Sequence, residues 1–503
     1  MESKEVFIVG AGVAGLSAGV YLQNSGFNVT IFEQHTIPGG LSTSWSRKGY
    51  LFEGGMHWLT GSSPELTLNR VWKEVGALKE NNPIYNRDPL YTLIRGNKKL
   101  NLYRDPKKLK EELLLKSPQD KKAINRLYRD ILLFKNVHML VNDIFGVKST
   151  HPTHASLCEL LKMAPAALRL SKLTKQSYLD YVASFKDTDI QHLLRTVIGA
   201  SYNALSFIYT LASFASGDCG YPEGGSIRLT QNMADSFIAL GGKIQFKTKV
   251  LAVKMQDNQV CGLEISTGNG KNTEFIKTNS IIVTQDTRTA IDTLFSPPLE
   301  EKWAKKMRKN VISEQTMFIC LGIKADLSKY PRAPVLALSE PLSAGGLEFS
   351  ELRLNNYAHY EKHAPDGCTA LTCLLLGQSY DWWKVRKEDG SYKTEKAALL
   401  ERFVSLVEQQ IPEIHGNIEA SDVATPCTYE RYTSSYKGGW MSVWRPGGSS
   451  FTFPAKSKNV KGLYFASERG MMPGGLPITV WAGRRAAQQI CKDTKTTFVC
   501  PEV

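Results

Sequence analysis

The chain has 503 residues, of which 42% are hydrophobic and 22% are charged, a composition that excludes an intrinsically disordered or fibrous protein. The formal net charge of +14 favours an anionic neighbour, such as nucleic acid, an anionic lipid surface or a phosphate-bearing ligand. No run approaches about 18 apolar residues, so the sequence predicts no simple membrane-spanning helix.

The nine cysteines form no CxxC pair and no cluster with histidine at metal-ligand spacing, so we expect no metal site. Their odd number in a large chain indicates a reducing compartment. The first residues contain no charged segment followed by an apolar one, as a signal sequence would. We therefore expect a cytoplasmic protein, either free or attached peripherally to the inner face of a membrane. The sequence leaves the oligomeric state open.

The N-terminal segment predicts a nucleotide-binding βαβ unit. Residues 5–10 form a short apolar run of β-forming residues that ends in glycine, and a helical pattern follows. In the intervening GxGxxG sequence, Gly10 makes the tight turn and Gly12 lets the backbone approach a pyrophosphate. Gly15 lets the helix pack closely on the strand. The N-terminus of the helix offers N–H groups to the phosphates.

A second predicted strand, residues 28–33, ends in an acid. Glu33 lies 18 residues beyond Gly15, where a carboxylate accepts hydrogen bonds from the ribose hydroxyls and would repel a 2′-phosphate. The other cofactor-binding candidates of this unit are Ala11, Val13, Ala14 and Gln34.

Two further glycine-rich segments favour FAD over a nicotinamide cofactor. One follows the acid at residues 38–43, where an ordinary nicotinamide dehydrogenase would continue into a helix, and the other spans residues 52–58. Paired glycines let the backbone lie against a large flat ligand. No second GxGxxG follows a strand later in the chain. The cofactor-binding candidates in these segments are Gly39, Gly40, Leu41, Ser42, Gly54, Gly55, Met56 and His57.

A similar unit is expected near the C-terminus. Residues 460–468 predict a strand that leads through a Gly/Pro loop, residues 469–477, into a helix over 478–490. Such a loop and helix form a second anion cradle, aimed at the same ligand from its other end. The cofactor-binding candidates here are Glu468, Gly475, Leu476, Pro477 and Ile478, together with Thr284 at the end of a buried strand over 280–284.

With these motifs the chain resembles the phytoene desaturase family, in the branch of carotenoid isomerases and retinol saturases, within a flavoprotein superfamily that includes amine oxidases. The matching segments are 10–33, 38–43, 52–58, 224–250 and 468–485. The resemblance implies an FAD-dependent oxidoreductase that desaturates, saturates or isomerises carbon–carbon bonds by hydride exchange with flavin N5. Its substrate would be a long apolar isoprenoid-, carotenoid-, retinoid- or steroid-like molecule. The resemblance also implies an adenine contact at Val250.

Two alternatives stay open at this point. A flavin amine oxidase usually reads Gly-Gly-Arg where this chain has Gly39, Gly40 and Leu41. A non-catalytic prenyl- or lipid-binding escort protein on the same fold would not need the intact glycines and Glu33. The chain departs from the resembled family at Ile478, where that family often has glycine, and it matches weakly over 85–215.

A reaction that adds or removes hydrogen also needs a proton partner. Our catalytic candidates are His57, Glu468 and Tyr221, of which His57 lies in a segment that the resemblance places near the flavin ring. A structural histidine and a ribityl-binding Glu468 are the alternatives. The tryptophans that are candidates to line an apolar tunnel, or to be plain core, are Trp382, Trp383, Trp440 and Trp444.

The expected fold class is α/β, with a Rossmann-type FAD-binding domain interrupted by a substrate domain of mixed sheet and helices. We assign residues 1–70, 217–298 and 425–503 to the FAD-binding domain, and residues 71–216 and 299–424 to the substrate domain. Residues 65–215 are expected to be mainly helical.

The densest basic segment of the sequence, residues 95–129, holds twelve Lys/Arg against four Asp/Glu. One interpretation is a contact with an anionic membrane beside the entrance for an apolar substrate. The other is a solvated helix face. No nucleic-acid-binding module accompanies the charge, so we expect no nucleic-acid partner.

Overall fold

The computed structural model describes residues 4–270, 272–445, 452–468 and 474–503. A five-stranded sheet in the order β21–β13–β1–β2–β9 carries the N-terminal unit, and every pairing in it is parallel. Its strands are β1 (Glu5–Val9), β2 (Asn28–Phe32), β9 (Lys243–Gln245), β13 (Ile281–Val283) and β21 (Leu463–Phe465). They come from three separate stretches of the chain, which confirms the predicted Rossmann-type α/β fold. The exact domain limits stay a prediction.

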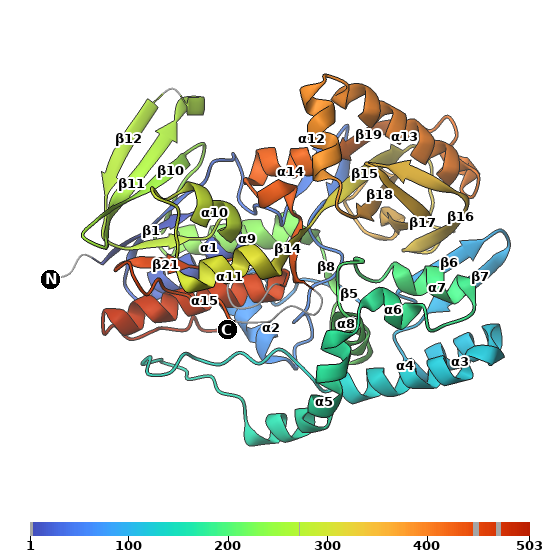
Figure 1. Cartoon of the computed structure of the whole chain (residues 1–503), viewed down its shortest axis with the longest axis horizontal. Helices are drawn as coiled ribbons and strands as arrows, with labels where there is room; N and C mark the ends of the chain where they lie inside the picture. Colours follow the sequence, from blue (N-terminus) through green and yellow to red (C-terminus); the bar gives the residue numbers. More distant parts are fainter. Residues whose placement is uncertain (1–3, 271, 446–451, 469–473) are drawn as a thin grey trace.

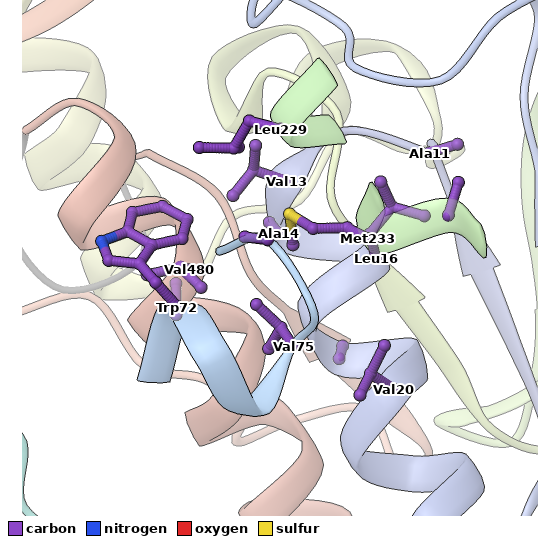
Figure 2. Close-up of a cluster of buried hydrophobic side chains, with 14 of the residues drawn as sticks. Ala11, Val13, Ala14, Leu16, Val20, Trp72, Val75, Leu229, Met233 and Val480 are labelled. Carbon is purple, nitrogen blue, oxygen red and sulfur yellow. The ribbon is translucent and has the colours of Figure 1, made fainter. Parts of the chain in front are cut away.

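Four helices bury one face of this sheet and each other. They are α1 (Val13–Asn24), α2 (Thr67–Glu74), α9 (Gly225–Ala239) and α15 (Leu476–Asp493). Figure 2 shows their apolar side chains converging, with Leu16 of α1, Met233 of α9 and Val480 of α15 fully buried. Trp72 of α2 closes the cluster and is also fully buried. Helices from both ends of the chain therefore share one core.

A smaller antiparallel sheet flanks the parallel one. It consists of β10 (Lys249–Gln256), β11 (Gln259–Thr267) and β12 (Asn272–Lys277). In Figure 1 it projects at the upper left, beside α10 (Thr287–Thr293) and α11 (Lys302–Asn310).

The second large layer is a seven-stranded sheet in the order β19–β15–β18–β17–β16–β6–β7. Its strands are β6 (Tyr91–Arg95), β7 (Lys98–Leu102), β15 (Thr316–Ile323), β16 (Pro334–Ala344), β17 (Leu347–Asn356), β18 (Thr369–Leu376) and β19 (Ile418–Ala424). The helices α12 (Tyr380–Glu388) and α13 (Tyr392–Glu408) pack on this sheet through a shared apolar cluster.

The expectation of a mainly helical segment over 65–215 is wrong for residues 91–102. β6 and β7 form a hairpin there, joined by the two residues Gly96 and Asn97. Such a pair is typical of a hairpin turn, and β6 then pairs in parallel with the distant β16.

Most of the rest of that segment is helical, as predicted, apart from β5 (Ile84–Tyr85) and the loop over 135–156. It contains α3 (Pro106–Lys116), α4 (Lys121–Phe134), α5 (Leu157–Lys175), α6 (Tyr178–Val182), α7 (Thr188–Arg195) and α8 (Ala204–Ala215). These helices lie together below the seven-stranded sheet at the lower right of Figure 1 and share a core of their own. Among the helices of the described residues, none combines the length and the apolar character that crossing a bilayer requires.

The remaining elements are short. They are β3 (Ser44–Arg47), β4 (Tyr50–Glu53), β5 (Ile84–Tyr85), β8 (Tyr221–Pro222), β14 (Val311–Glu314), α14 (Pro426–Thr433) and β20 (Met441–Trp444). β14 pairs with β20 and thereby joins the middle of the chain to its C-terminal part.

A buried charge network fastens the loop before α5 to the C-terminal helix. Arg484 of α15 is 1% exposed, and its Nη1 lies 2.5 Å from Oδ1 of Asp143. Gln488 donates a second hydrogen bond to the same oxygen at 2.6 Å. Glu74 of α2 lies 3.9 Å from the Arg484 guanidinium and accepts a hydrogen bond from Tyr21. Because the network is buried, removal of one partner leaves a charge without compensation.

We expect Asp143→Ala to lower the free energy of unfolding by about 3 kcal/mol or more, since it leaves the buried Arg484 without its nearest carboxylate. Asp235→Ala, an exposed change on α9, is the matched control and should stay within about 0.5 kcal/mol of the parent. Urea unfolding followed by tryptophan fluorescence compares the three proteins. Equal midpoints for Asp143→Ala and the control would contradict the assigned role.

Candidate functional site

One cavity of about 810 Å³ is lined by residues from almost the whole length of the chain. At one end its walls are the glycine-rich loops of the parallel sheet, and at the other they are helices α4, α5 and α8. Its size falls within the range of small-molecule and cofactor sites, roughly 300 to 1,000 Å³.

The N-terminus of α1 opens into this cavity. Gly10, Gly12, Val13 and Ala14 line it, no side chain caps the helix, and its first turn contains no acidic residue. The first N–H groups of the helix are therefore available to an anion. Gly15 lies behind them, where any side chain would overlap with the Gly10 carbonyl oxygen, in agreement with its predicted packing role.

The carboxylate of Glu33 is held in place at the end of β2. The backbone N–H of Ala11 donates to its Oε2 at 2.8 Å, and that of His35 donates to its Oε1 at 2.8 Å. Glu33 is 7% exposed and lines the cavity, as does Gln34. Ala11 does not line the cavity, so its contribution is to orient Glu33. The oriented carboxylate keeps accepting capacity for a ligand hydroxyl.

The predicted second glycine-rich loop lies against the first. The N–H of Gly39 donates to the Ala11 carbonyl oxygen at 2.9 Å, and Gly39 has φ +122°. A Cβ on residue 39 would lie 2.5 Å from the Ser42 carbonyl oxygen, so only glycine fits. Gly39, Gly40, Leu41 and Ser42 all line the cavity.

Glu53 positions the third glycine-rich segment. It is 1% exposed and accepts hydrogen bonds from the backbone N–H groups of Gly55, Met56 and Ser226 at 2.7 to 3.0 Å. Gly55 and Met56 line the cavity, whereas Gly54 packs against Trp45 behind it.

Tyr221 is separated from the cavity, in contrast to the role predicted for it. It is 5% exposed, and its hydroxyl lies 3.1 Å from both Glu53 Oε2 and His363 Nε2. Burial and the Glu53 charge raise the pKa of Tyr221. Its hydrogen bonds give Tyr221 a structural role, because they help to hold Glu53.

His57 lines the cavity as a neutral imidazole. Burial and the nearby charges of Arg353 and Arg87 lower the pKa of His57 well below its ordinary value. Its Nδ1 lies 3.4 Å from the Asn355 amide nitrogen, while Nε2 has no hydrogen-bond partner among the described residues. The Trp440 ring lies 5.9 Å away, and Trp440 also lines the cavity. His57 is thus a neutral polar group for a bound molecule to meet.

The C-terminal unit reaches the cavity from the opposite side. Gly475 caps the N-terminus of α15 without a side-chain hydrogen bond, and it lines the cavity with Leu476, Pro477 and Ile478. Ser442 donates to Glu468 Oε1 at 2.6 Å. Glu468, Val250 and Thr284 line the cavity too. The predicted loop residues 469–473 lie outside the described residues.

The far end of the cavity is apolar. Its walls include Phe134, Val137, Met139, Met163, Leu170 and Leu205. The sequence analysis missed these residues, although the apolar segment 202–215 that contains α8 is a signal that indicates a buried helix. Glu314 at the end of β14 was also missed, because it reaches the cavity only through the pairing of β14 with β20.

The tunnel prediction for the tryptophans is correct for Trp440 alone. Trp444 stacks on Phe453 with 5.6 Å between ring centroids and does not line the cavity. Trp382 and Trp383 belong to α12, on the seven-stranded sheet, and pack with its apolar cluster.

The hydrogen-bonding groups that the chain presents to the cavity fit a dinucleotide. Two uncapped helix N-termini, at Gly12 and Gly475, offer N–H groups to anions, and Glu33 offers a carboxylate to ribose hydroxyls. Residues 13–491 match the model of the flavin containing amine oxidoreductase family. The chain belongs to this family. Its cofactor is FAD.

Curated relatives include enzymes of carotenoid and retinoid chemistry. The chain is 23% identical to a chloroplastic prolycopene isomerase of Daucus carota, over 97% of this chain and 80% of the relative. It is 23% identical to a lycopene-forming phytoene desaturase of Pantoea ananas, over 97% and 99%. It is also 23% identical to an all-trans-retinol 13,14-reductase of Danio rerio, over 87% and 77%.

Among solved structures, putrescine oxidase bound to putrescine superposes with a TM-score of 0.61 at 16% identity, over 98% of both chains. At this identity the likeness shows the fold. The family match makes the chain an FAD-dependent oxidoreductase.

We expect Gly12→Asp to abolish FAD retention, because its carboxylate would face the pyrophosphate at the N-terminus of α1. The apo protein should keep its fold, since the nearest heavy atom to a Cβ on residue 12 lies 3.8 Å away. Gly12→Ala, which adds the methyl group without the charge, is the control. Flavin absorbance per protein chain after gel filtration is the measurement, and a Gly12→Asp protein that stays yellow would contradict the assignment.

Proposed function

We propose that this oxidoreductase acts on carbon–carbon bonds of a long apolar, isoprenoid-like molecule, by desaturation, saturation or cis–trans isomerisation. The observation that carries the proposal is the continuity of the cavity. The loops that fit a dinucleotide and the apolar helical walls line the same space. A polyene that enters between the helices would end beside the cofactor.

Residues at different places along the cavity have different roles. The N-termini of α1 and α15 bind the phosphates and the polar part of the cofactor, and Glu33 orients the ribose. The apolar side chains of α4, α5 and α8 exclude water and bind the substrate by burial of apolar surface. FAD, when bound, supplies hydride transfer. Neutral His57 meets the bound molecules without adding a charge.

One residue of the cavity argues against an amine oxidase. Leu41 lines the cavity at the position where amine oxidases usually carry arginine.

The test is anaerobic incubation of the purified holoenzyme, with its flavin either oxidised or reduced, with prolycopene, phytoene and all-trans-retinol. Mass spectrometry and chromatography follow the products, with putrescine and benzylamine as amine controls. We expect conversion of at least one polyene, and the flavin state that it needs assigns the direction of the reaction. Turnover of an amine without turnover of any polyene would contradict the proposal.

We further propose that the protein takes its substrate from an anionic membrane surface through α5. Leu157, Leu161 and Leu168 repeat at helical spacing and are 72%, 64% and 92% exposed. Lys162 and Lys172 flank them and are exposed, and α5 contains one acidic residue. A helix with exposed leucines and lysines suits the boundary between lipid headgroups and acyl chains.

The position of α5 connects this surface to the cavity. Met163 and Leu170 of the same helix line the cavity from within, and α5 lies at the lower edge of the molecule in Figure 1. The neighbouring α3 and α4 carry the exposed Lys107, Lys108 and Lys121 of the basic segment. The leucines on α5 and the lysines around them would thus place the substrate end of the cavity against an anionic bilayer.

We expect flotation with phosphatidylcholine vesicles to increase when phosphatidylglycerol is added, and to weaken at high salt. The double variant Leu161→Asp/Leu168→Asp should reduce partitioning at least tenfold, because each exposed leucine contributes about 1.5 kcal/mol or more when it is buried in lipid. Ile238→Asp, at a residue of α9 that is 50% exposed, is the control. Flotation that the double variant leaves unchanged would remove α5 from the proposal.

A further inference from the structure

A buried carboxyl group stands in the cavity wall. Glu314 ends β14, lines the cavity and is 1% exposed. Its backbone is fixed, because the N–H of Trp440 donates to the Glu314 carbonyl oxygen at 2.7 Å. The Ser201 hydroxyl is hydrogen-bonded to its carboxyl group.

The neighbouring loop leaves room for this carboxyl group. A Cβ on Gly199 would lie 2.6 Å from Glu314 Oε1 and 3.4 Å from the Tyr202 ring. Gly199 and Tyr202 both line the cavity. The missing side chain at residue 199 therefore makes the space that the Glu314 carboxyl occupies, at the start of the segment that leads into α8.

The surroundings favour the neutral form of Glu314. Burial raises the pKa of Glu314, and the Ser201 hydroxyl lowers it only in part. The ionisable groups that share this part of the cavity are Tyr202 and Glu468. Burial first, and then the charges of Glu314 and Glu468, raise the pKa of Tyr202. No cation among the described residues forms an ion pair with Glu314, so nothing there offsets the effect of burial, which favours the neutral acid.

We propose that Glu314 is the proton donor to the polyene in this cavity. The inference rests on the proposed function and narrows it. The O–H bond of Glu314 breaks, and its proton forms a C–H bond with the electron pair of one C=C bond. The adjacent carbon is left electron-deficient, with its charge spread over the conjugated chain.

Two balanced outcomes follow from this proton transfer. In isomerisation, the proton returns to the Glu314 carboxylate after rotation about the weakened bond, and no oxidant or reductant is consumed. In saturation, a bound reduced flavin would supply the hydride that the electron-deficient carbon needs, and Glu314 regains a proton from solvent. Desaturation is the reverse reaction and requires a base to take the proton, and a protonated acid is the wrong form for it. Glu314 therefore favours saturation or isomerisation.

Infrared spectroscopy of the FAD-loaded protein tests the protonation state without any substrate. At neutral pH the wild type should show the C=O band of a protonated carboxylic acid, and Glu314→Gln should lack it. Glu351→Gln, on β17 and away from the cavity, is the matched control and should keep the band. A wild-type spectrum without a band that depends on Glu314 would overturn the inference.

Turnover in D₂O with prolycopene and all-trans-retinol tests the donor role. With all-trans-retinol the wild type should incorporate deuterium into the saturated carbon. With either probe, Glu314→Gln should reduce kcat at least tenfold while its flavin spectrum stays unchanged. Wild-type kcat should fall as the pH rises through the raised pKa of Glu314, because a donor must be protonated. Glu314→Asp should restore part of the activity.

The outcomes separate the two proposals. If the wild type converts neither probe nor phytoene, the proposed function fails and the donor role falls with it. If the wild type converts a probe and Glu314→Gln does so at the same rate, the donor role alone is overturned. An unchanged pH profile in Glu314→Gln would have the same meaning.

Discussion

The nucleotide end of the cavity depends on the direct contact between α1 and the end of β1. Gly15 allows this contact, because any side chain there would overlap with the Gly10 carbonyl oxygen. The contact brings the first turn of α1 to the edge of the sheet, where its free N–H groups face the cavity. Gly483 of α15 allows a similar close contact on the other side of α1, because a side chain there would overlap with the Ala14 carbonyl oxygen. Both helix N-termini at the cavity are thus placed by glycines that do not line it.

The chemistry of the cavity changes along its length. Hydrogen-bonding backbone and the oriented Glu33 stand at one end, and apolar helices at the other. Burial lowers the pKa of His57 and raises the pKa of Glu314, which favours the neutral form of each. The polar end of the cavity suits the polar part of the cofactor, and the apolar end suits an apolar substrate.

Local signals made part of the structure predictable. The strand, glycine turn and helix of residues 5–24, and the C-terminal helix, are specified by neighbouring residues, so their positions followed from the sequence. Features that depend on distant pairing did not. The partner of β6 is β16, more than two hundred residues away, and Glu314 reaches the cavity only because β14 pairs with β20. Tyr221 was misplaced for the same reason, because its partner His363 belongs to a remote segment.

The residues that line the nucleotide end of the cavity lie far apart in the sequence, which has a consequence for biosynthesis. The loops at Gly12 and Gly39 leave the ribosome more than four hundred residues before Gly475 and Ile478. A nascent chain that has folded its first strands still lacks one wall of the site. Stable capture of the flavin must therefore wait until residues 475–478 have been made, and a chain terminated before them would emerge colourless.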